Sequence, residues 1–94
     1  MTRHGDFKVP GGTLVVADFD VIEGKLAGVR ITGDFFLYPD SALADINSAL
    51  EGAPAAAGPD VWAGLIRDRL PAGVEMLGFG PDDVATAIAR GLAG

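Results

Sequence analysis

Few residues of this sequence carry chemically reactive side chains. There is no cysteine, which excludes disulfides, thiolate metal sites, iron–sulfur ligation and thiol nucleophiles. Histidine occurs once, as His4, so neither a cluster of histidine metal ligands nor a Ser-His-Asp triad around a core histidine is expected. We therefore expect no catalytic residues, no metal site and no self-sufficient enzyme.

Two glycine-rich segments could instead hold a phosphate. Gly78-Phe79-Gly80 precedes a helical segment, as a dinucleotide-binding loop does, but the third glycine position is Asp83. A second carboxylate, Asp82, adds negative charge at the helix start where a phosphate would bind. Val9-Pro10-Gly11-Gly12 lacks the spacing of a P-loop, and no Lys-Ser/Thr follows it. Both segments are therefore predicted to be turns, the first before a helix and the second within a hairpin.

The length and composition describe one globular domain spanning residues 1–94. The hydrophobic fraction is 49% and the mean hydropathy is +0.33, which exclude a disordered chain. The longest apolar stretches are far shorter than the roughly 20 residues of a membrane span, and no signal peptide is apparent. We therefore expect a cytoplasmic protein without a membrane partner. The net charge of −6 argues against nucleic acid as a partner.

The hydrophobic pattern has period two in the first half of the chain and helical spacing in the second. It predicts three strands, a short extended piece and three helices. The strands are 5–10, 13–22 and 26–38, and the extended piece is 74–77. The helices begin near 39–41, 59 and 81, and the first two end near 51 and 70. The Ala- and Gly-rich run 52–59 is expected to be a flexible connection. The fold class is therefore α+β, with a three-stranded antiparallel sheet and about three helices packed on one of its faces.

Strand register follows from the need for one apolar face. A three-residue loop at 23–25 pairs Phe19 with Val29 and Ala17 with Ile31, and it sets Asp18 opposite Arg30. A two-residue loop would set Asp20 opposite Ala27 and is rejected on that ground.

The same argument at the first hairpin pairs Phe7 with Val15 and Lys8 with Leu14. Lys8, Leu14 and Asp34 then form a row across the outer face at one end of the sheet. Lys8 and Asp34 flank the middle strand, about 10 Å apart.

Gly33-Asp34-Phe35-Phe36 predicts an apolar patch on the outer face. Successive side chains of a strand point to opposite faces, so Phe35 faces the core and Phe36 faces outward beside Tyr38. With Leu14 and Val16 they form an apolar surface that needs a partner. The alternative is that the strand curls, or that a helix wraps its end, and buries Phe36.

Three other residues have simpler interpretations. His4 is expected to be a mobile tail residue, and Trp62 a core residue. Asp18 and Arg30 are expected to form a surface ion pair of little energetic value.

The sequence resembles the accessory (C-terminal) domain of lipoate–protein ligases. The resemblance rests on His4-Gly-Asp-Phe-Lys-Val-Pro-Gly-Gly12, on Ile31-Thr-Gly-Asp-Phe-Phe36 and on a helix ending Leu50-Glu-Gly52. It extends from about residue 4 to the last helix and is similar to the free-standing small subunit of bipartite ligases. Thr13 stands where family members often have a lysine, which leaves Lys8 as the lysine near the turn. The family's fold is similar to that of the SufE sulfur-acceptor and IscU iron–sulfur scaffold proteins.

The resemblance implies a role in protein lipoylation. The ligase activates lipoate with Mg-ATP to lipoyl-adenylate and then transfers the lipoyl group to a lysine of an acceptor domain. In bipartite members the small subunit is needed for adenylation, while the catalytic lysine and the adenylate pocket belong to the large subunit. The implied partners are that catalytic subunit and, indirectly, lipoyl-acceptor domains. The chain would need no cofactor of its own, and the complex would use ATP, Mg and lipoate.

We expect the outer face of the sheet and the 10–12 turn to dock on the catalytic subunit, as a lid supplied in trans. Phe36, Tyr38, Leu14 and Val16 would be the apolar anchor. Lys8 would pair with a charge of the large subunit or of the substrate; the alternative is a solvated lysine near Asp34. The complete expected interface is Lys8, Pro10, Gly11, Gly12, Leu14, Val16, Gly33, Asp34, Phe36 and Tyr38.

Two rival functions remain at this point. One is a protein-interaction module that shares only the fold and has no role in lipoate metabolism. The other is an independent small-molecule binder, which ranks last because a ligand-sized cavity is costly in 94 residues.

Overall fold

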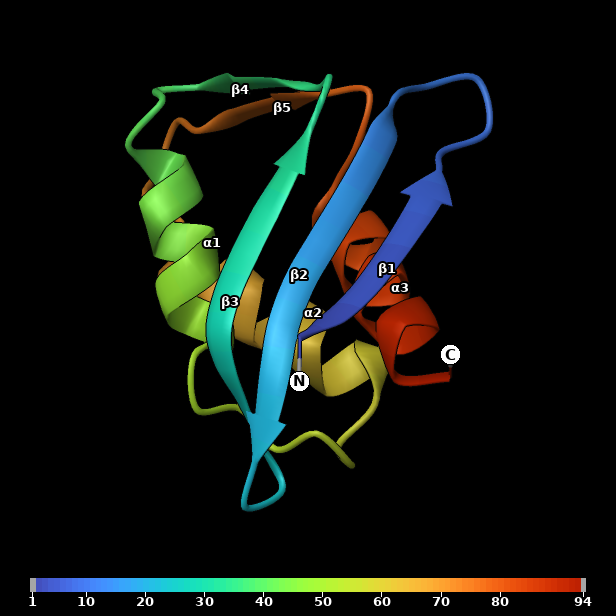
Figure 1. The fold of residues 1–94 in the computed structure, drawn as a ribbon. Helices are drawn as coiled ribbons and strands as arrows, with labels where there is room; N and C mark the ends of the chain where they lie inside the picture. The colour runs from blue at the N-terminus through green and yellow to red at the C-terminus, as the bar shows by residue number, and fades with distance from the viewer. Residues whose placement is uncertain (1, 94) are drawn as a thin grey trace.

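The protein folds as a three-stranded antiparallel sheet with three helices on one of its faces (Figure 1). The computed structural model describes residues 2–93. The sheet has the order β1-β2-β3, with strands β1 (Arg3–Lys8), β2 (Leu14–Ile22) and β3 (Lys25–Gly33). The helices are α1 (Ala42–Leu50), α2 (Pro59–Arg69) and α3 (Pro81–Ala93). The α+β class predicted from the hydrophobic pattern is confirmed. None of the helices among the described residues is both long and apolar enough to cross a lipid bilayer.

The β2–β3 hairpin differs from the predicted three-residue loop. Its turn has two residues, because Ile22 is opposite Lys25 and Asp20 is opposite Ala27. A bulge then shifts the register by one residue, so that Asp18 is opposite Arg30, as predicted, and Ala17 opposite Ile31. The register that the sequence pattern led us to reject, with Asp20 opposite Ala27, is thus present near the turn. The predicted register is present beyond the bulge. The predicted pairing of Phe19 with Val29 is absent, because the bulge lies at that position. The bulged strand is β3, where Gly28 takes a positive φ of 61°.

The third strand also ends earlier than predicted. β3 stops at Gly33, and residues 36–38 form a separate strand, β4 (Phe36–Tyr38). β4 pairs antiparallel with β5 (Glu75–Leu77) as a two-stranded ribbon across one end of the molecule (Figure 1). The physical reason lies at residues 34–35, the corner between β3 and β4. The carboxylate of Asp34 accepts the N–H of Leu14 there. If β3 continued, that N–H would instead bond a backbone carbonyl of β3. The continuous strand 26–38 is therefore wrong.

The backbone donors along the outer edge of β3 are bonded by polar side chains of α1 and of Glu51, which follows the helix. Asn47 accepts the N–H of Ile31 through Oδ1 at 3.0 Å. The carboxylate of Glu51 accepts the N–H groups of Gly28 and Val29 at 3.0 and 3.1 Å. These two side chains satisfy the backbone donors that the bulge and the strand edge leave unpaired.

The 52–59 connection is fastened to the sheet rather than flexible, so that prediction is wrong. Backbone bonds join Leu26 to both Gly52 and Ala53, and Ala55 to Gly24, at 2.7–2.8 Å. The indole N–H of Trp62 donates to the carbonyl of Pro54 at 2.9 Å. Trp62 is 2% exposed, which confirms it as a core residue. The segment is held by backbone hydrogen bonds, which do not depend on residue type and are therefore not indicated by the sequence pattern.

The hydrophobic core lies between the sheet and the helices. Strand β1 packs so closely on α3 that a Cβ at Gly5 would collide with Ala87 O and Gly91 N. A Cβ at Gly91 would come within 2.8 Å of the Phe19 ring. The first strand and the last helix therefore touch through their backbones. The largest fully buried side chains are Trp62, Phe19, Leu26, Ile31, Ile46, Leu50, Ile66, Ile88, Val15 and Val84.

Candidate functional site

The 9–13 turn is a tight hairpin fixed to the loop that follows β5. The N–H of Val9 donates to Thr13 O, and the N–H of Gly12 donates to Val9 O, both at 2.9 Å. Thr13 in turn donates its N–H and its hydroxyl to the carbonyl of Gly78, each at 3.3 Å. Thr13 therefore has a structural role at the position where the resembled family often has a lysine. Pro10 and Gly11 are left exposed at the tip.

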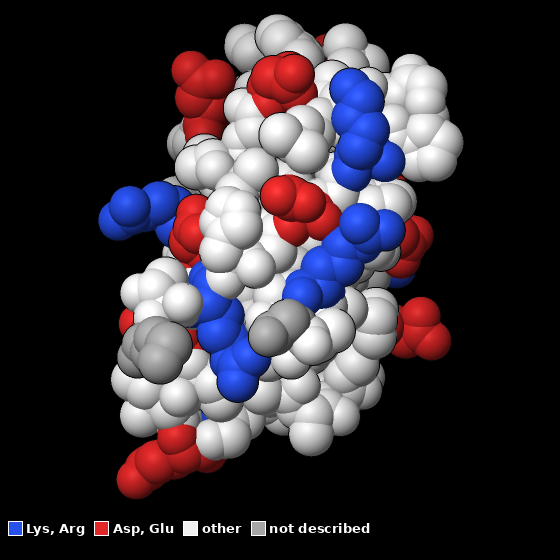
Figure 2. Space-filling view, turned by 45° about the vertical axis from the view of Figure 1, so that its right-hand side comes forward, with Lys and Arg blue, Asp and Glu red and all other residues white. Residues whose placement is uncertain are grey.

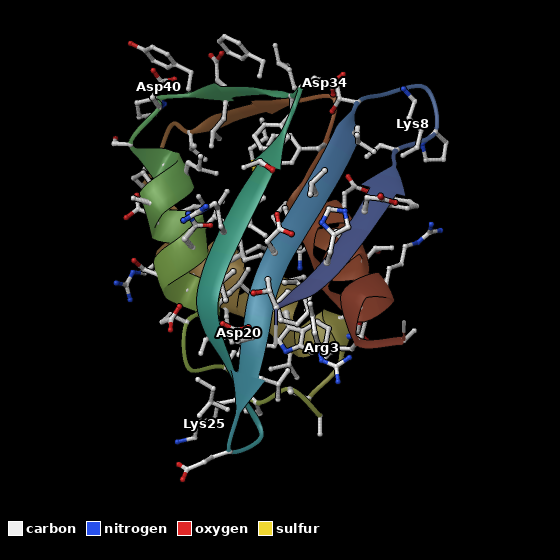
Figure 3. The ribbon with its side chains drawn as sticks, in the orientation of Figure 1. Arg3, Lys8, Asp20, Lys25, Asp34 and Asp40 are labelled. Carbon is white, nitrogen blue, oxygen red and sulfur yellow. The ribbon has the colours of Figure 1, made fainter. Side chains whose placement is uncertain are left out.

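Lys8 and Asp34 lie at this same end of the sheet (Figure 3), and Leu14 is paired with each of them. Lys8 is opposite Leu14 in the β1–β2 register, as predicted. Asp34 Oδ1 accepts the N–H of Leu14 at 2.8 Å, so its carboxylate ties the β3–β4 corner to the start of β2. Gly33 lies so close to Leu14 O that a side chain there would collide with it. The glycine and the aspartate of the Gly33-Asp34 motif thus both shape the corner.

The exposed side of the β4–β5 ribbon is largely apolar, and its polar residue is Glu75, opposite Tyr38. Phe36 and Leu77 are directly opposite each other, and Tyr38 follows on the same side. These three side chains, which we call the ribbon face, are 51%, 59% and 61% exposed for Phe36, Leu77 and Tyr38. Leu37, on the other side of the ribbon, is buried. Large aromatic and aliphatic side chains exposed together are typical of a surface that binds another protein.

The expected interface is therefore divided between two surfaces. Phe36 and Tyr38 project from the ribbon and not from the three-stranded sheet, so their predicted position on its outer face is wrong. Val16 is on that outer face, opposite Asp6 and Thr32, and is half-buried. Of the two predicted anchor residues that do lie on the main sheet, Leu14 adjoins the corner that leads into the ribbon and Val16 does not. Leu77 was missed, because no local pattern indicates that 75–77 pairs with 36–38.

Phe35 and Phe79 support the ribbon from beneath. Their rings stack with centroids 4.0 Å apart and planes inclined at 20°. Phe35 is half-buried and Phe79 buried, which agrees with the predicted inward direction of Phe35. The stack joins the β3–β4 corner to the loop before α3. The residue before Phe36 is thereby packed against a second segment of the chain.

The Gly78-Phe79-Gly80 segment is a turn leading into α3, as predicted. Asp83 turns back and accepts the N–H of Gly80 through Oδ2 at 2.8 Å. This is the arrangement of a capping box, in which an acidic side chain at the third helical position satisfies a free donor at the helix start. A carboxylate of the chain thus lies where a dinucleotide phosphate would be held, and the segment is not a nucleotide-binding loop.

His4 is an ordered part of β1 and not a tail residue, so its prediction is wrong. Its Nδ1 lies 2.7 Å from Asp18 Oδ1, and its Nε2 lies 3.6 Å from Asp6 Oδ2. The hydrogen bond that His4 donates to the carboxylate of Asp18 raises the pKa of His4 above 6.5, with smaller contributions from the charges of Asp18 and Asp6. Asp18 therefore pairs with His4, where an ion pair with Arg30 was expected. Across residues 2–93 no three His, Cys, Asp or Glu side chains gather in a group that could hold a metal ion.

Comparisons with known proteins give one informative result. No model of a protein family matches this sequence, and no curated protein does. The fold is similar to that of a chain in a structure of an archaeal lipoylation system from Thermoplasma acidophilum, which contains a bi-partite lipoate protein ligase and its E2 lipoyl domain. The two chains are 24% identical, the TM-score is 0.76, and the match covers 94% of each. At this identity the match shows that the fold is shared over almost the whole length.

Proposed function

We propose that this chain is the small, non-catalytic subunit of a bipartite lipoate–protein ligase. In this role it binds a separate catalytic subunit and is required for the ATP-dependent conversion of lipoate to lipoyl-adenylate. The catalytic subunit then transfers the lipoyl group to a lysine of an acceptor domain. ATP, Mg and lipoate are used by the complex in the cytoplasm, and this chain holds none of them by itself.

The observation that carries the proposal is the exposed apolar ribbon face on a fold shared with a chain of a bipartite ligase system. The Gly-Asp-Phe-Phe motif that suggested the family builds this surface directly. Its glycine and aspartate form the corner with Leu14, Phe35 stacks beneath, and Phe36 projects outward. Burying two aromatic rings and a leucine against a partner would remove a large apolar area from water.

In the proposed complex the ribbon face is the anchor, and the 9–13 turn extends the contact. Because Thr13 bonds Gly78 and Asp34 bonds Leu14, the turn, the corner and the ribbon form one connected end of the molecule. Such a preformed surface loses little conformational entropy on binding. We propose that docking orders the adenylate-binding loops of the catalytic subunit and excludes water from them. Lys8, at the margin of this end, pairs with a negative charge of the partner or of the substrate.

The test is lipoate-dependent exchange between ATP and pyrophosphate, catalysed by the same organism's ligase subunit that lacks its own C-terminal extension. We expect exchange to appear only when this chain is added. Equal exchange with and without the chain would contradict the accessory role in adenylation. The function would then be that of an interaction module sharing only the fold.

The same reaction mixture distinguishes an accessory subunit from a lipoyl acceptor. An acceptor domain gains a lipoyl group on a lysine, and this chain has two lysines, Lys8 and Lys25. After a complete ligation reaction, mass spectrometry is expected to show the chain unmodified while an added acceptor domain is lipoylated. Lipoylation of Lys8 or Lys25 would instead place the chain on the acceptor side of the reaction.

A further inference from the structure

The outer edge of β1 is open for pairing with another strand. In an antiparallel ladder, residues alternate between facing the partner strand and facing away from it. The N–H of Val9 donates to Thr13 O at the hairpin, so the backbone N–H and C=O groups of Phe7, Gly5 and Arg3 also point toward β2. The backbone groups of His4, Asp6 and Lys8 consequently point away from β2, and within residues 2–93 no second strand pairs with β1.

The opposite edge of the same sheet is closed. The donors of Gly28, Val29 and Ile31 on β3 are held by Glu51 and Asn47, and the 52–55 segment bonds the start of the strand. An unpaired edge is a template for pairing with another chain, and proteins commonly cover edges that have no partner. The difference between the two edges indicates that β1 is left open for a partner.

A depression of about 340 Å³ lies beside the open edge. His4, Gly5 and Asp6 line it from β1, and Arg90 and Ala93 line it from α3. The guanidinium of Arg90 lies 4.9 Å from the centre of the Phe7 ring, which holds this cation beside the strand. A side chain from an added strand could therefore enter the depression and reach Arg90.

The open edge is also positively charged in a chain whose net charge is −6. Arg3, Lys8 and Arg90, three of the seven Lys and Arg residues, lie on β1 and the facing part of α3. Figure 2, which brings this side forward, shows several Lys and Arg side chains on it, with Asp and Glu side chains between them. His4 is a further cation when protonated, and Asp6 is the acidic residue of the strand. The charge favours a partner segment that carries carboxylates.

We propose that an extended, acidic segment of the catalytic subunit pairs with β1 as a fourth strand of the sheet. This inference rests on the proposed function, because it takes its partner to be that subunit. The backbone groups of His4, Asp6 and Lys8 supply the hydrogen bonds, and a carboxylate of the segment binds Arg90 in the depression. The ribbon face and the open edge are then two parts of one interface, the first apolar and the second polar.

A second copy of this chain fits the edge less well. Pairing two β1 edges about a two-fold axis sets the two α3 helices on the same side of the enlarged sheet. In an antiparallel pairing centred near Asp6, Arg3 of each copy would lie close to Lys8 of the other copy. The resulting repulsion between like charges opposes self-association.

The test uses a substitution that removes only an outward donor. Asp6→Pro deletes an N–H that points away from β2 and leaves the β1–β2 bonds in place, since proline is tolerated on an edge strand. The matched control, Asp6→Thr, removes the same charge and keeps the donor. We expect Asp6→Pro to weaken binding to the catalytic subunit by about tenfold or more, and Asp6→Thr to bind at least as tightly as the wild type.

A second pair of variants tests the depression beside the edge. Arg90→Gln is expected to weaken binding to the catalytic subunit, whereas Arg67→Gln, on α2, is not.

Amide hydrogen exchange gives a readout that does not depend on the folding of a variant. The N–H groups of His4, Asp6 and Lys8 are expected to exchange rapidly in the free wild-type chain and slowly in its complex with the catalytic subunit. A complex in which these amides stay rapid, or in which Asp6→Pro binds like Asp6→Thr, would overturn the edge pairing and leave the proposed function intact. Absence of any complex would overturn both, and a concentration-dependent dimer of this chain that protects the same amides would identify a second copy as the occupant.

Discussion

The carboxylate of Asp34 and the backbone N–H of Leu14 are joined by a hydrogen bond of 2.8 Å between two segments 20 residues apart. This bond lies where the third strand leaves the main sheet and turns into the ribbon. It fixes the direction in which Phe36 leaves the corner, so the stability of the corner and the shape of the ribbon face are linked.

Removal of this bond is expected to destabilise the fold modestly. Asp34→Ala should lower the free energy of unfolding by about 0.5–1.5 kcal/mol, because the freed N–H of Leu14 is exposed and can bond water. Asp34→Asn retains an acceptor oxygen and should lose less. Urea unfolding of both variants checks this order, and equal losses would show that the hydrogen bond at Leu14 is not the source.

Phe36→Asp is expected to abolish binding to the catalytic subunit while leaving the fold intact. Phe36 is already half exposed, so the charge costs little in the free chain and is desolvated only in the complex. Ile22→Asp is the matched control, since Ile22 is 60% exposed at the β2–β3 hairpin, away from the ribbon. Titration calorimetry measures both affinities, and full affinity in Phe36→Asp would remove the ribbon face as the anchor.

Lys8→Ala is expected to lower lipoate adenylation more than it lowers binding. A lysine at the margin of the docked end can contact a substrate phosphate or carboxylate without contributing much of the apolar contact area. Lys25→Ala, which changes the other lysine at the opposite end of the sheet (Figure 3), is the control. Pyrophosphate exchange is measured with enough of each variant to saturate the catalytic subunit, so that a loss of adenylation is separated from a loss of binding. Unchanged turnover in Lys8→Ala would exclude a role near the substrate.

Two Gly→Ala substitutions are expected to have opposite effects on stability. Gly5→Ala forces a methyl group into the backbone of α3 and should destabilise the fold by about 1–3 kcal/mol or more. Gly64, inside α2, has open space around its Cα, and Gly64→Ala should stabilise by about 0.5–1 kcal/mol through helix propensity. Thermal and urea unfolding of the two variants test the close packing of β1 on α3. A neutral Gly5→Ala would contradict it.

The His4–Asp18 contact is expected to make stability depend on pH. Because Asp18 raises the pKa of His4 in the folded protein, the protonated ring is favoured by folding. Its stabilising contribution is complete below pH 6.5, the ordinary value, and is lost as the pH rises through the raised pKa. His4→Gln should therefore be less stable than the wild type at pH 5.5 and approach it at pH 8.5. A constant difference across this range would contradict the linkage, and salt should weaken the effect because the pair is exposed.

The sequence pattern predicted the features that depend on alternation and on helix boundaries. The apolar positions of β2, the helix starts at Pro59 and Pro81 and the buried Trp62 all reflect the requirement for a single apolar layer. The β1–β2 register followed from the same requirement and is confirmed.

The features that were missed depend on backbone contacts between distant segments. The bulge at Gly28 allows two registers in one hairpin. The two-residue and three-residue loops compared from the sequence each set a single register for the whole hairpin. The extended piece at 74–77 was predicted and is present as β5, but its pairing with 36–38 was not predicted. The 52–55 segment is fixed by backbone bonds that any residue could make. Phe36 was rightly expected to be exposed and wrongly placed on the main sheet, because its direction depends on the corner bond of Asp34.

The backbone contact between Gly5 and α3 has a consequence for the order in which the molecule is made. Among the elements of this fold, β1 is synthesised before the others and the helix that covers it is synthesised after them. Until α3 emerges, the inner side of β1 and the ring of Phe19 have no cover, and the nascent sheet is exposed to incorrect pairing. Folding of this chain is therefore completed only after α3 has emerged, and a stalled nascent chain that ends before Pro81 is expected to be a substrate for chaperones.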